Sequence, residues 1–393
     1  MTIASPTTHA SSRAARPPSS VALRPSNRRQ WFFPGPFLTV GGAVAIAVVW
    51  LTLLPAAPLP DRIGETLGVE AIWLMSCSIL AMSNRPGLAR WFGGVSGQLW
   101  WHRITGAIGI SVGIIHPRVM ATHGDPTFAV GAMSILEKLS ILLVLSAFLA
   151  PAGRAGGWRG PLGWIARASY DTWRILHGVL AVYVGFALYH GFVTGQITQE
   201  SPLLVALYLA VCAFAAWILL DQMVVRRLRN HRRNGTVTGL SRAEHEVVIT
   251  LRPDRDEHTR PGDVVYLGAR GTRERPIPLT VIGRTPDAQL QVVIAASGRG
   301  STRLVGSLAV GDRVSVSPPQ ATPPADRAPE PQVWLAGGSG IAPVLGWLEA
   351  ADAGSRVVLL WSHRGEPPQQ ILDQLNQLRD RHPELSLTRL DTT

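Results

Sequence analysis

Six apolar segments dominate the first 225 residues and limit the folds that are open to this chain. They run over about 34–55, 66–83, 98–121, 131–151, 172–195 and 202–224. Each is close to the ~20 residues that a helix needs to cross a bilayer. Charged residues make up only 16% of the chain, and most of them lie before residue 35 or after residue 220. The pattern therefore predicts an all-α membrane domain of six helices over residues 34–225.

The charges between these segments predict how the bundle is oriented. The tail, residues 1–33, has five arginines and no acidic residue, and Arg226-Arg227-Leu228-Arg229-Asn230-His231-Arg232-Arg233 follows the last segment. Cytoplasmic loops are enriched in Lys and Arg, so we expect both termini in the cytoplasm, in a bacterial cell membrane. The tail is rich in Ser, Pro and Ala and is expected to be disordered.

The net charge of +11 does not indicate nucleic-acid binding, although a basic chain raises that question. The basic residues flank apolar segments, where membrane topology explains them. The sequence has no nucleic-acid-binding motif and no groove pattern of aromatic and basic residues. The expected partner is the lipid bilayer.

Two of the apolar segments each carry a pair of histidines. His102 and His116 lie fourteen residues apart in the third, and His177 and His190 lie thirteen apart in the fifth. At a rise of about 1.5 Å per residue, each pair spans ~20 Å of a hydrocarbon core about 30 Å thick. Ionisable groups at this depth are commonly functional, and imidazole is an axial ligand of haem iron. The alternative is that these histidines cap helix ends or bond to neighbouring groups.

The two spacings are not equivalent around a helix. At about 100° per residue, fourteen residues return to within ~40° of the starting face, but thirteen end ~140° away. The fifth helix must therefore be distorted, or must meet two haems from different sides. Gly178 and Gly185 would permit a distortion.

These two histidine pairs resemble the ferric reductase-like transmembrane domain that ferric reductases and NADPH oxidases share. The resemblance implies that His102 and His177 bind an inner haem and that His116 and His190 bind an outer one. The sequence has no Cys-x-x-Cys-His motif, so both haems would be of b type, held without covalent bonds.

The residues after Asn234 predict a different kind of structure. Short alternating segments at 246–251, 263–267, 290–295 and 312–316 are typical of antiparallel strands in a small barrel over 234–320. After a Pro-rich link, residues 331–393 read as a strand at 332–336, a glycine turn, a helix from about Pro343 and strands at 356–361 and 385–390. This order predicts a parallel α/β unit.

The second half resembles the flavin and nicotinamide module of ferredoxin-NADP reductases. Gly337-Gly338-Ser339-Gly340-Ile341-Ala342-Pro343 is similar to the turn that binds the nicotinamide dinucleotide, and Arg364 favours NADPH over NADH. In the flavin motif, Arg275 and Thr280 are the expected contacts, while Ile277 and Pro278 replace the usual aromatic and hydroxyl residues. The expected second phosphate contacts are Ser301 and Thr302. The family's later α/β elements do not follow residue 390, so we expect a partial nucleotide-binding domain.

The sequence thus predicts a six-helix haem domain, a β-barrel FAD domain and a partial α/β NAD(P)H domain. The main hypothesis is a transmembrane oxidoreductase that passes electrons from NAD(P)H through FAD and two haems to a small acceptor outside, either ferric iron or oxygen. A second hypothesis is a haem-only carrier supplied by a separate reductase. A third is a haem-binding sensor or assembly subunit without enzymatic activity.

Overall fold

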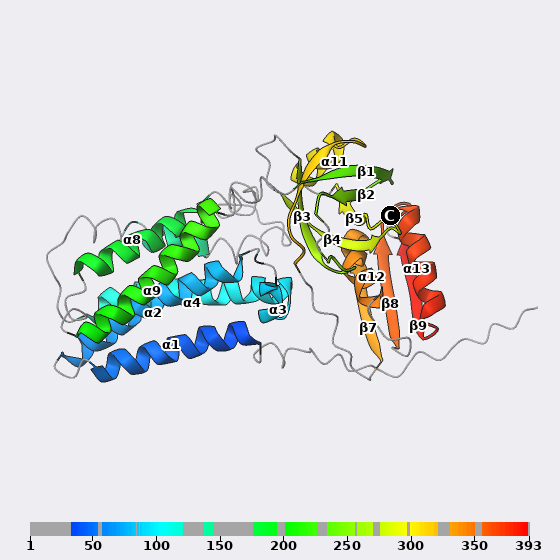
Figure 1. Ribbon diagram of the computed structural model, residues 1–393. Coiled ribbons are helices and arrows are strands. Elements are labelled where there is room, and N and C mark those ends of the chain that lie inside the picture. The colour runs from blue at the N-terminus through cyan, green and yellow to red at the C-terminus, as the bar shows by residue number, and fades with distance from the viewer. Residues whose placement is uncertain are drawn as a thin grey trace, which may run out of the picture.

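The computed structural model has a helical part followed along the chain by a β-rich part (Figure 1). It describes residues 33–53, 57–83, 85, 87–120, 135, 137–144, 176–194, 201–225, 234–255, 258–269, 276–296, 299–320, 331–349 and 356–391. The predicted tail, apart from residue 33, and most of the predicted span 131–151 lie outside these residues.

Apart from one four-residue helix between the second and third segments, the named helices of the first part follow the predicted apolar segments. They are α1 (Pro34–Leu53), α2 (Leu59–Ala81), α3 (Leu88–Trp91), α4 (Val95–Val119), α8 (Val179–Thr194) and α9 (Pro202–Leu220), which continues as a π-helix over Asp221–Val225. Three stretches, Pro34–Leu53, Leu59–Ala81 and Pro202–Val225, are long and apolar enough to cross a membrane, and Val179–Phe192 is apolar but shorter. The chain is thus compatible with a membrane protein, but a bundle of six spanning helices is not confirmed.

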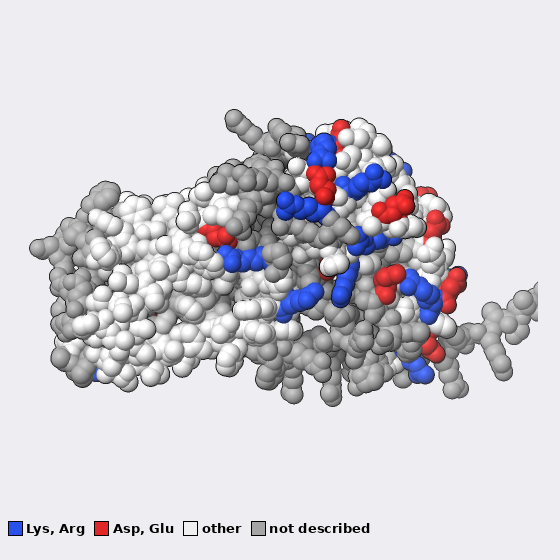
Figure 2. Space-filling model, in the orientation of Figure 1, with Lys and Arg blue, Asp and Glu red and all other residues white. Residues whose placement is uncertain are grey.

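Helix α2 lies at the centre of the described helices and packs against α1, α4, α8 and α9. Its buried residues Val69 and Ile72 share a cluster with Trp50 of α1 and Leu204 of α9. In contrast, the outer face of α1 exposes apolar side chains, and Phe37 is 73% exposed. Figure 2 shows that charged side chains gather on the β-rich part and are sparse on the helical part. An apolar outer surface of this kind suits contact with lipid.

Glycines allow α4 to approach α2 closely. A Cβ atom on Gly109 would lie 3.0 Å from Met75 Cγ and 3.1 Å from Leu74 Cβ, both on α2. Small residues at such contacts are common where helices pack within a membrane. The close approach also determines which α2 groups can reach the histidines of α4.

The β-rich part begins with a closed antiparallel barrel in the order β1-β2-β5-β4-β3-β6. Its strands are β1 (Asn234–Arg242), β2 (Glu246–Pro253), β3 (Val264–Ala269), β4 (Ile277–Arg284), β5 (Leu290–Ala295) and β6 (Arg313–Val316), with α11 (Arg299–Ser307) between the last two. Inward-facing side chains such as Ile249, Val265 and Val292 form the core. The four segments that the alternating pattern predicted correspond to β2, β3, β5 and β6, and β1 and β4 complete the barrel.

A parallel three-stranded sheet follows, in the order β7-β8-β9. Its elements are β7 (Gln332–Gly337), a 3₁₀ turn at Gly338–Gly340, α12 (Ile341–Glu349), β8 (Val357–His363), α13 (Gln369–Arg381) and β9 (Leu385–Asp391). Ile341 and Leu345 of α12 share a core cluster with Val248 and Ile282 of the barrel. Packed apolar side chains therefore join the sheet unit to the barrel, and Figure 1 shows α12 between β4 and the three-stranded sheet.

Candidate functional site

The structure brings the four histidines together as two pairs of neighbouring rings in an edge-to-face arrangement. The ring centroids of His102 and His177 are 5.7 Å apart, and the ring planes are inclined at 80°. Those of His116 and His190 are 6.2 Å apart and inclined at 76°. Both pairs include one histidine of α4; its partner is His177, just before α8, in the first pair and His190, within α8, in the second.

The α4 histidines are oriented by carbonyl groups of α2. His102 Nδ1 lies 3.1 Å from Ser78 O and 2.9 Å from Ser78 Oγ. His116 Nδ1 lies 2.6 Å from Gly64 O. A carbonyl oxygen can only accept, so Nδ1 of both rings must carry the proton and donate it. Nε2 is then unprotonated, and an unprotonated imidazole nitrogen can bind a metal.

The separations of the paired rings fit a haem between them. A metal–imidazole bond is about 2.0–2.1 Å long, and a ring nitrogen lies about 1.2 Å from the ring centroid. Two imidazoles on opposite sides of one iron would thus have centroids about 6.4 Å apart. The centroid separations of 5.7 and 6.2 Å are close to this value. The described residues hold no cluster of three or more His, Cys, Asp or Glu suited to a bare ion, but haem needs only axial ligands from the protein.

The helix carrying His177 and His190 is interrupted directly after His177. Residues 176–177 are helical, Gly178 lies in a turn, and α8 begins at Val179. The N–H of Ala181 donates to the carbonyl oxygen of Gly178, three residues earlier, at 3.1 Å. In a regular α-helix the acceptor lies four residues earlier. This break is a distortion of the kind that the thirteen-residue spacing required, and it lies at one of the two glycines proposed for it.

The two segments expected to bind flavin lie next to each other on the barrel. A Cβ atom on Gly300, in α11, would lie 3.8 Å from Ile277 Cδ1 at the start of β4. Ser301 and Thr302 follow in α11, where Thr302 Oγ1 donates to Ala296 O at 3.4 Å. Thr280 lies in β4, half-buried and opposite Val264 of β3. Arg275 falls outside the described residues.

The glycine turn lies where a dinucleotide turn is found in α/β folds, between the first strand and the first helix of the sheet. Gly337 ends β7, Gly338 and Gly340 form the 3₁₀ turn with Ser339 between them, and Pro343 lies in the first turn of α12. Gly338 has a φ of +49°, a left-handed conformation that favours glycine. The turn thus has the geometry that the sequence predicted, and its nucleotide-binding role stays a prediction.

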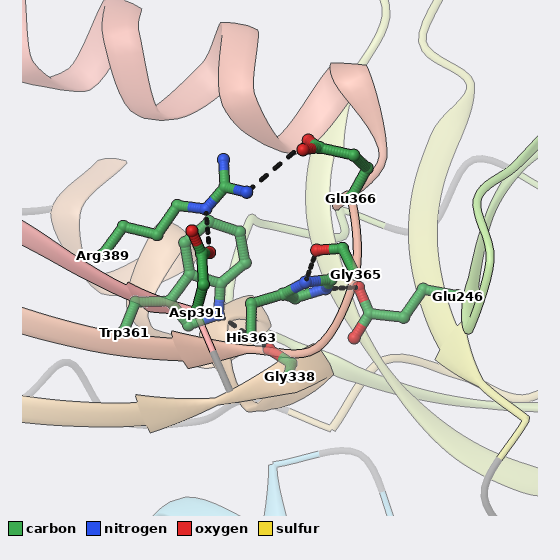
Figure 3. Close-up of polar contacts among 8 residues, drawn as sticks. All are labelled: Glu246, Gly338, Trp361, His363, Gly365, Glu366, Arg389 and Asp391. Carbon is green, nitrogen blue, oxygen red and sulfur yellow. Dashed lines mark hydrogen bonds and ion pairs between the residues drawn. The ribbon is translucent and has the colours of Figure 1, made fainter. Parts of the chain in front are cut away.

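Two buried side chains that sequence reasoning missed support this turn (Figure 3). His363, at the end of β8, and Glu246, at the start of β2, are 2% and 3% exposed, and His363 Nε2 lies 3.3 Å from Glu246 Oε2. His363 Nδ1 lies 2.9 Å from Gly365 O. Trp361 Nε1 donates to Gly338 O at 3.1 Å, and a Cβ atom on Gly338 would lie 3.4 Å from Glu246 Oε1. The 117 residues between Glu246 and His363 explain why no local motif could reveal the pair.

Arg364 lies just beyond this pair, exposed and directly after β8. It is at the carboxyl end of the parallel strands, the edge where α/β sheets bind ligands. Figure 3 shows Glu366 and Asp391 beside the Arg389 guanidinium at the same end of the sheet. The edge therefore presents both a cation and acidic groups to a ligand.

No protein-family model matches the sequence, and no curated protein matches it. Among solved structures, the chain is similar to the flavohem-like FAD/NAD-binding domain of nitric oxide dioxygenase from Vibrio cholerae O1 biovar El Tor, with 16% identity and a TM-score of 0.34 over 41% of this chain and 75% of that one. A siderophore-interacting protein from Acinetobacter baumannii has 14% identity and a TM-score of 0.35 over 41% and 67%. The ferredoxin reductase of carbazole 1,9a-dioxygenase has 19% identity and a TM-score of 0.33 over 41% and 50%, so the chain spans half its length.

Proposed function

We propose that this protein is a transmembrane oxidoreductase that transfers electrons from NAD(P)H, by way of FAD and two b-type haems, to a small acceptor on the outer face. The acceptor is ferric iron or oxygen. The observation that carries the proposal is the pair of facing imidazole rings at each of two levels of the helical part. The cofactors supply the redox chemistry when bound, and the chain supplies ligands, orientation and insulation from water.

The spacing of the histidines along α4 supports a proposal of transfer across a bilayer. His102 and His116 are separated by fourteen residues of α4, which is about 20 Å along the axis. Two haems held at these levels would cover most of the ~30 Å apolar core. The apolar neighbours of α2 and α4 would keep water from the space between them.

In the proposed donor half, residues of several elements would have distinct roles. The backbone N–H groups of the glycine turn and the start of α12 would face a pyrophosphate, as helix N-termini do for anions. Ser301 and Thr302 would bind the flavin phosphates, with Arg275 and Thr280 on the flavin segment. Arg364 would contact a 2′-phosphate, which favours NADPH.

The test is an optical spectrum of the detergent-purified protein, recorded anaerobically before and after NADPH is added. Reduced b-type haem bands on NADPH alone are expected. His102→Ala should leave fewer than two haems per chain and stop the transfer, since one axial ligand is lost. A variant that retained both haems would contradict the ligand assignment, and a parent protein without haem would contradict the proposal.

A second candidate is a haem-only electron carrier that a separate reductase supplies. The composition of β4 favours it, because Pro278 stands opposite Tyr266 in the barrel ladder and has no N–H to donate. Ile277 likewise offers no aromatic face to a flavin. Protein purified with haem but without flavin, and reduced by dithionite but not by NADPH, would support this second function.

A further inference from the structure

Helix α2 contacts both histidines of α4 but does so differently at the two levels. At one level the acceptors for the imidazole N–H are the hydroxyl and the carbonyl of Ser78. At the other, the acceptor is the Gly64 carbonyl alone. The Ser78 side chain thus hydrogen-bonds a haem-ligand candidate directly.

We propose that Ser78 is a positioning residue that orients His102 and lowers the reduction potential of the haem held by His102 and His177. This inference rests on the proposed function, because it needs a haem between those rings. It goes beyond that function because it assigns a role to a residue that neither contacts the iron nor belongs to any motif in the sequence.

The hydrogen bonds around Ser78 determine where each proton lies. Ser78 Oγ donates to His102 O at 2.9 Å, so its hydrogen is committed and its lone pairs face the ring. His102 Nδ1–H then donates to Ser78 Oγ at 2.9 Å and to Ser78 O at 3.1 Å. The hydroxyl therefore acts as an acceptor towards the imidazole, and it also ties the ring to the backbone of its own residue.

Accepting a hydrogen bond from a ligand imidazole increases the basicity of its metal-binding nitrogen. A more basic ligand stabilises ferric over ferrous iron, and hydrogen bonding beyond the ligands is one of the means by which a protein sets haem potential. Removal of the Ser78 hydroxyl leaves the Ser78 carbonyl as acceptor, so the tautomer is kept while the basicity falls. We therefore expect Ser78→Ala to keep both haems and to raise one midpoint potential.

The experiment is an optical redox titration of the full-length protein in detergent, for the parent and for Ser78→Ala. One of the two midpoint potentials should rise by up to about 59 mV, which corresponds to a tenfold change in the ferric-to-ferrous preference. The other midpoint potential should not change. Ser76→Ala is the matched control, because Ser76 is buried on the same helix and its hydroxyl bonds only to Ile72 O, at 2.6 Å; it should change neither potential.

Unchanged potentials in Ser78→Ala would overturn the inference, and so would an equal shift in Ser76→Ala. If Ser78→Ala loses a haem, the deciding variant is Ser78→Cys, which nearly preserves the volume and replaces the hydroxyl with a weaker acceptor. It should raise the same potential by a smaller amount, and no rise would overturn the inference. A parent protein without haem would instead refute the proposed function, so the two failures are distinguishable.

Discussion

Replacing Gly346 with alanine should weaken the packing of the α/β unit against the barrel. Gly346 is buried in α12, and a Cβ atom there would lie 2.1 Å from Gly262 N, 2.2 Å from Gly262 Cα and 2.6 Å from Pro261 C. All three are backbone atoms of the barrel, so no side chain can rotate away to make room. Gly262 itself has a φ of +89°, a conformation that glycine adopts without a steric penalty.

The expected loss follows from two opposing effects. Overpacking a tight contact costs about 1–3 kcal/mol, and a contact made entirely by backbone belongs at the upper end. Alanine gains back about 1 kcal/mol of helix propensity over glycine. The net destabilisation is then about 2 kcal/mol. For the β-rich part, in which the barrel and the α/β unit pack together, this lowers the melting temperature by roughly 4–8 °C.

The assay is thermal unfolding of the purified protein, followed by calorimetry, together with the KM for NADPH. The glycine turn directly precedes α12, so displacing α12 should raise the KM for NADPH. The haem content should stay close to that of the parent protein, because the histidines lie in the helical part. Gly306→Ala is the control: Gly306 is exposed in α11, and a Cβ atom there meets nothing within 4 Å, so that variant should be as stable as the parent or slightly more stable. Equal stability of Gly346→Ala and the parent would refute the predicted contact between α12 and the barrel.

Three other predictions concern the β-rich part, the helical part and the membrane topology. Glu246→Leu should destabilise the protein by about 1–3 kcal/mol, because it removes the carboxylate that lies 3.3 Å from the buried His363 Nε2, and adding His363→Leu should recover part of that loss in a denaturant double-mutant cycle. Arg85→Ala should lower the melting temperature of the helical part, since Arg85 pairs with Asp221 at 3.0 Å and lies 4.2 Å above the Trp217 ring; Arg85→Lys should restore only part of it. A reporter enzyme that works only in the cytoplasm should be active when it is fused after residue 393, and one that works only in the periplasm should be inactive there. Activity of the periplasmic reporter would contradict the orientation derived from the arginines.

Much of the architecture could be predicted because it depends on local patterns. The apolar segments predicted the long helices at the positions where the structure has them. The exception is the start of α2, which lies at Leu59, seven residues before the predicted start at residue 66. Its first turns contain Asp61, Arg62 and Glu65, whose charge hid the helix from a hydropathy pattern. Period-two alternation likewise revealed β2, β3, β5 and β6. It missed β4, which contains Pro278, and β1, whose glycines blur the alternation.

The candidate sites divide in the same way. Residue type and spacing were enough to nominate the four histidines and the glycine turn, because axial ligation and phosphate binding need particular residues at particular intervals along one element. They were not enough to find Ser78, Glu246 or His363. Each of these acts through a partner on another element, and the chain separation is 24 residues for Ser78 and His102 and 117 for Glu246 and His363.

By itself, the sequence determined which segments are apolar, which strands alternate and which helices carry imidazoles, since these are properties of neighbouring residues. Only the tertiary structure decided which ring faces which, which nitrogen of His102 and His116 is left for a metal, and how the barrel meets the glycine turn. Those outcomes depend on the close approach of α2 to α4 and of Gly262 to Gly346. Contacts of this kind arise when separate elements pack, and no interval along the chain encodes them.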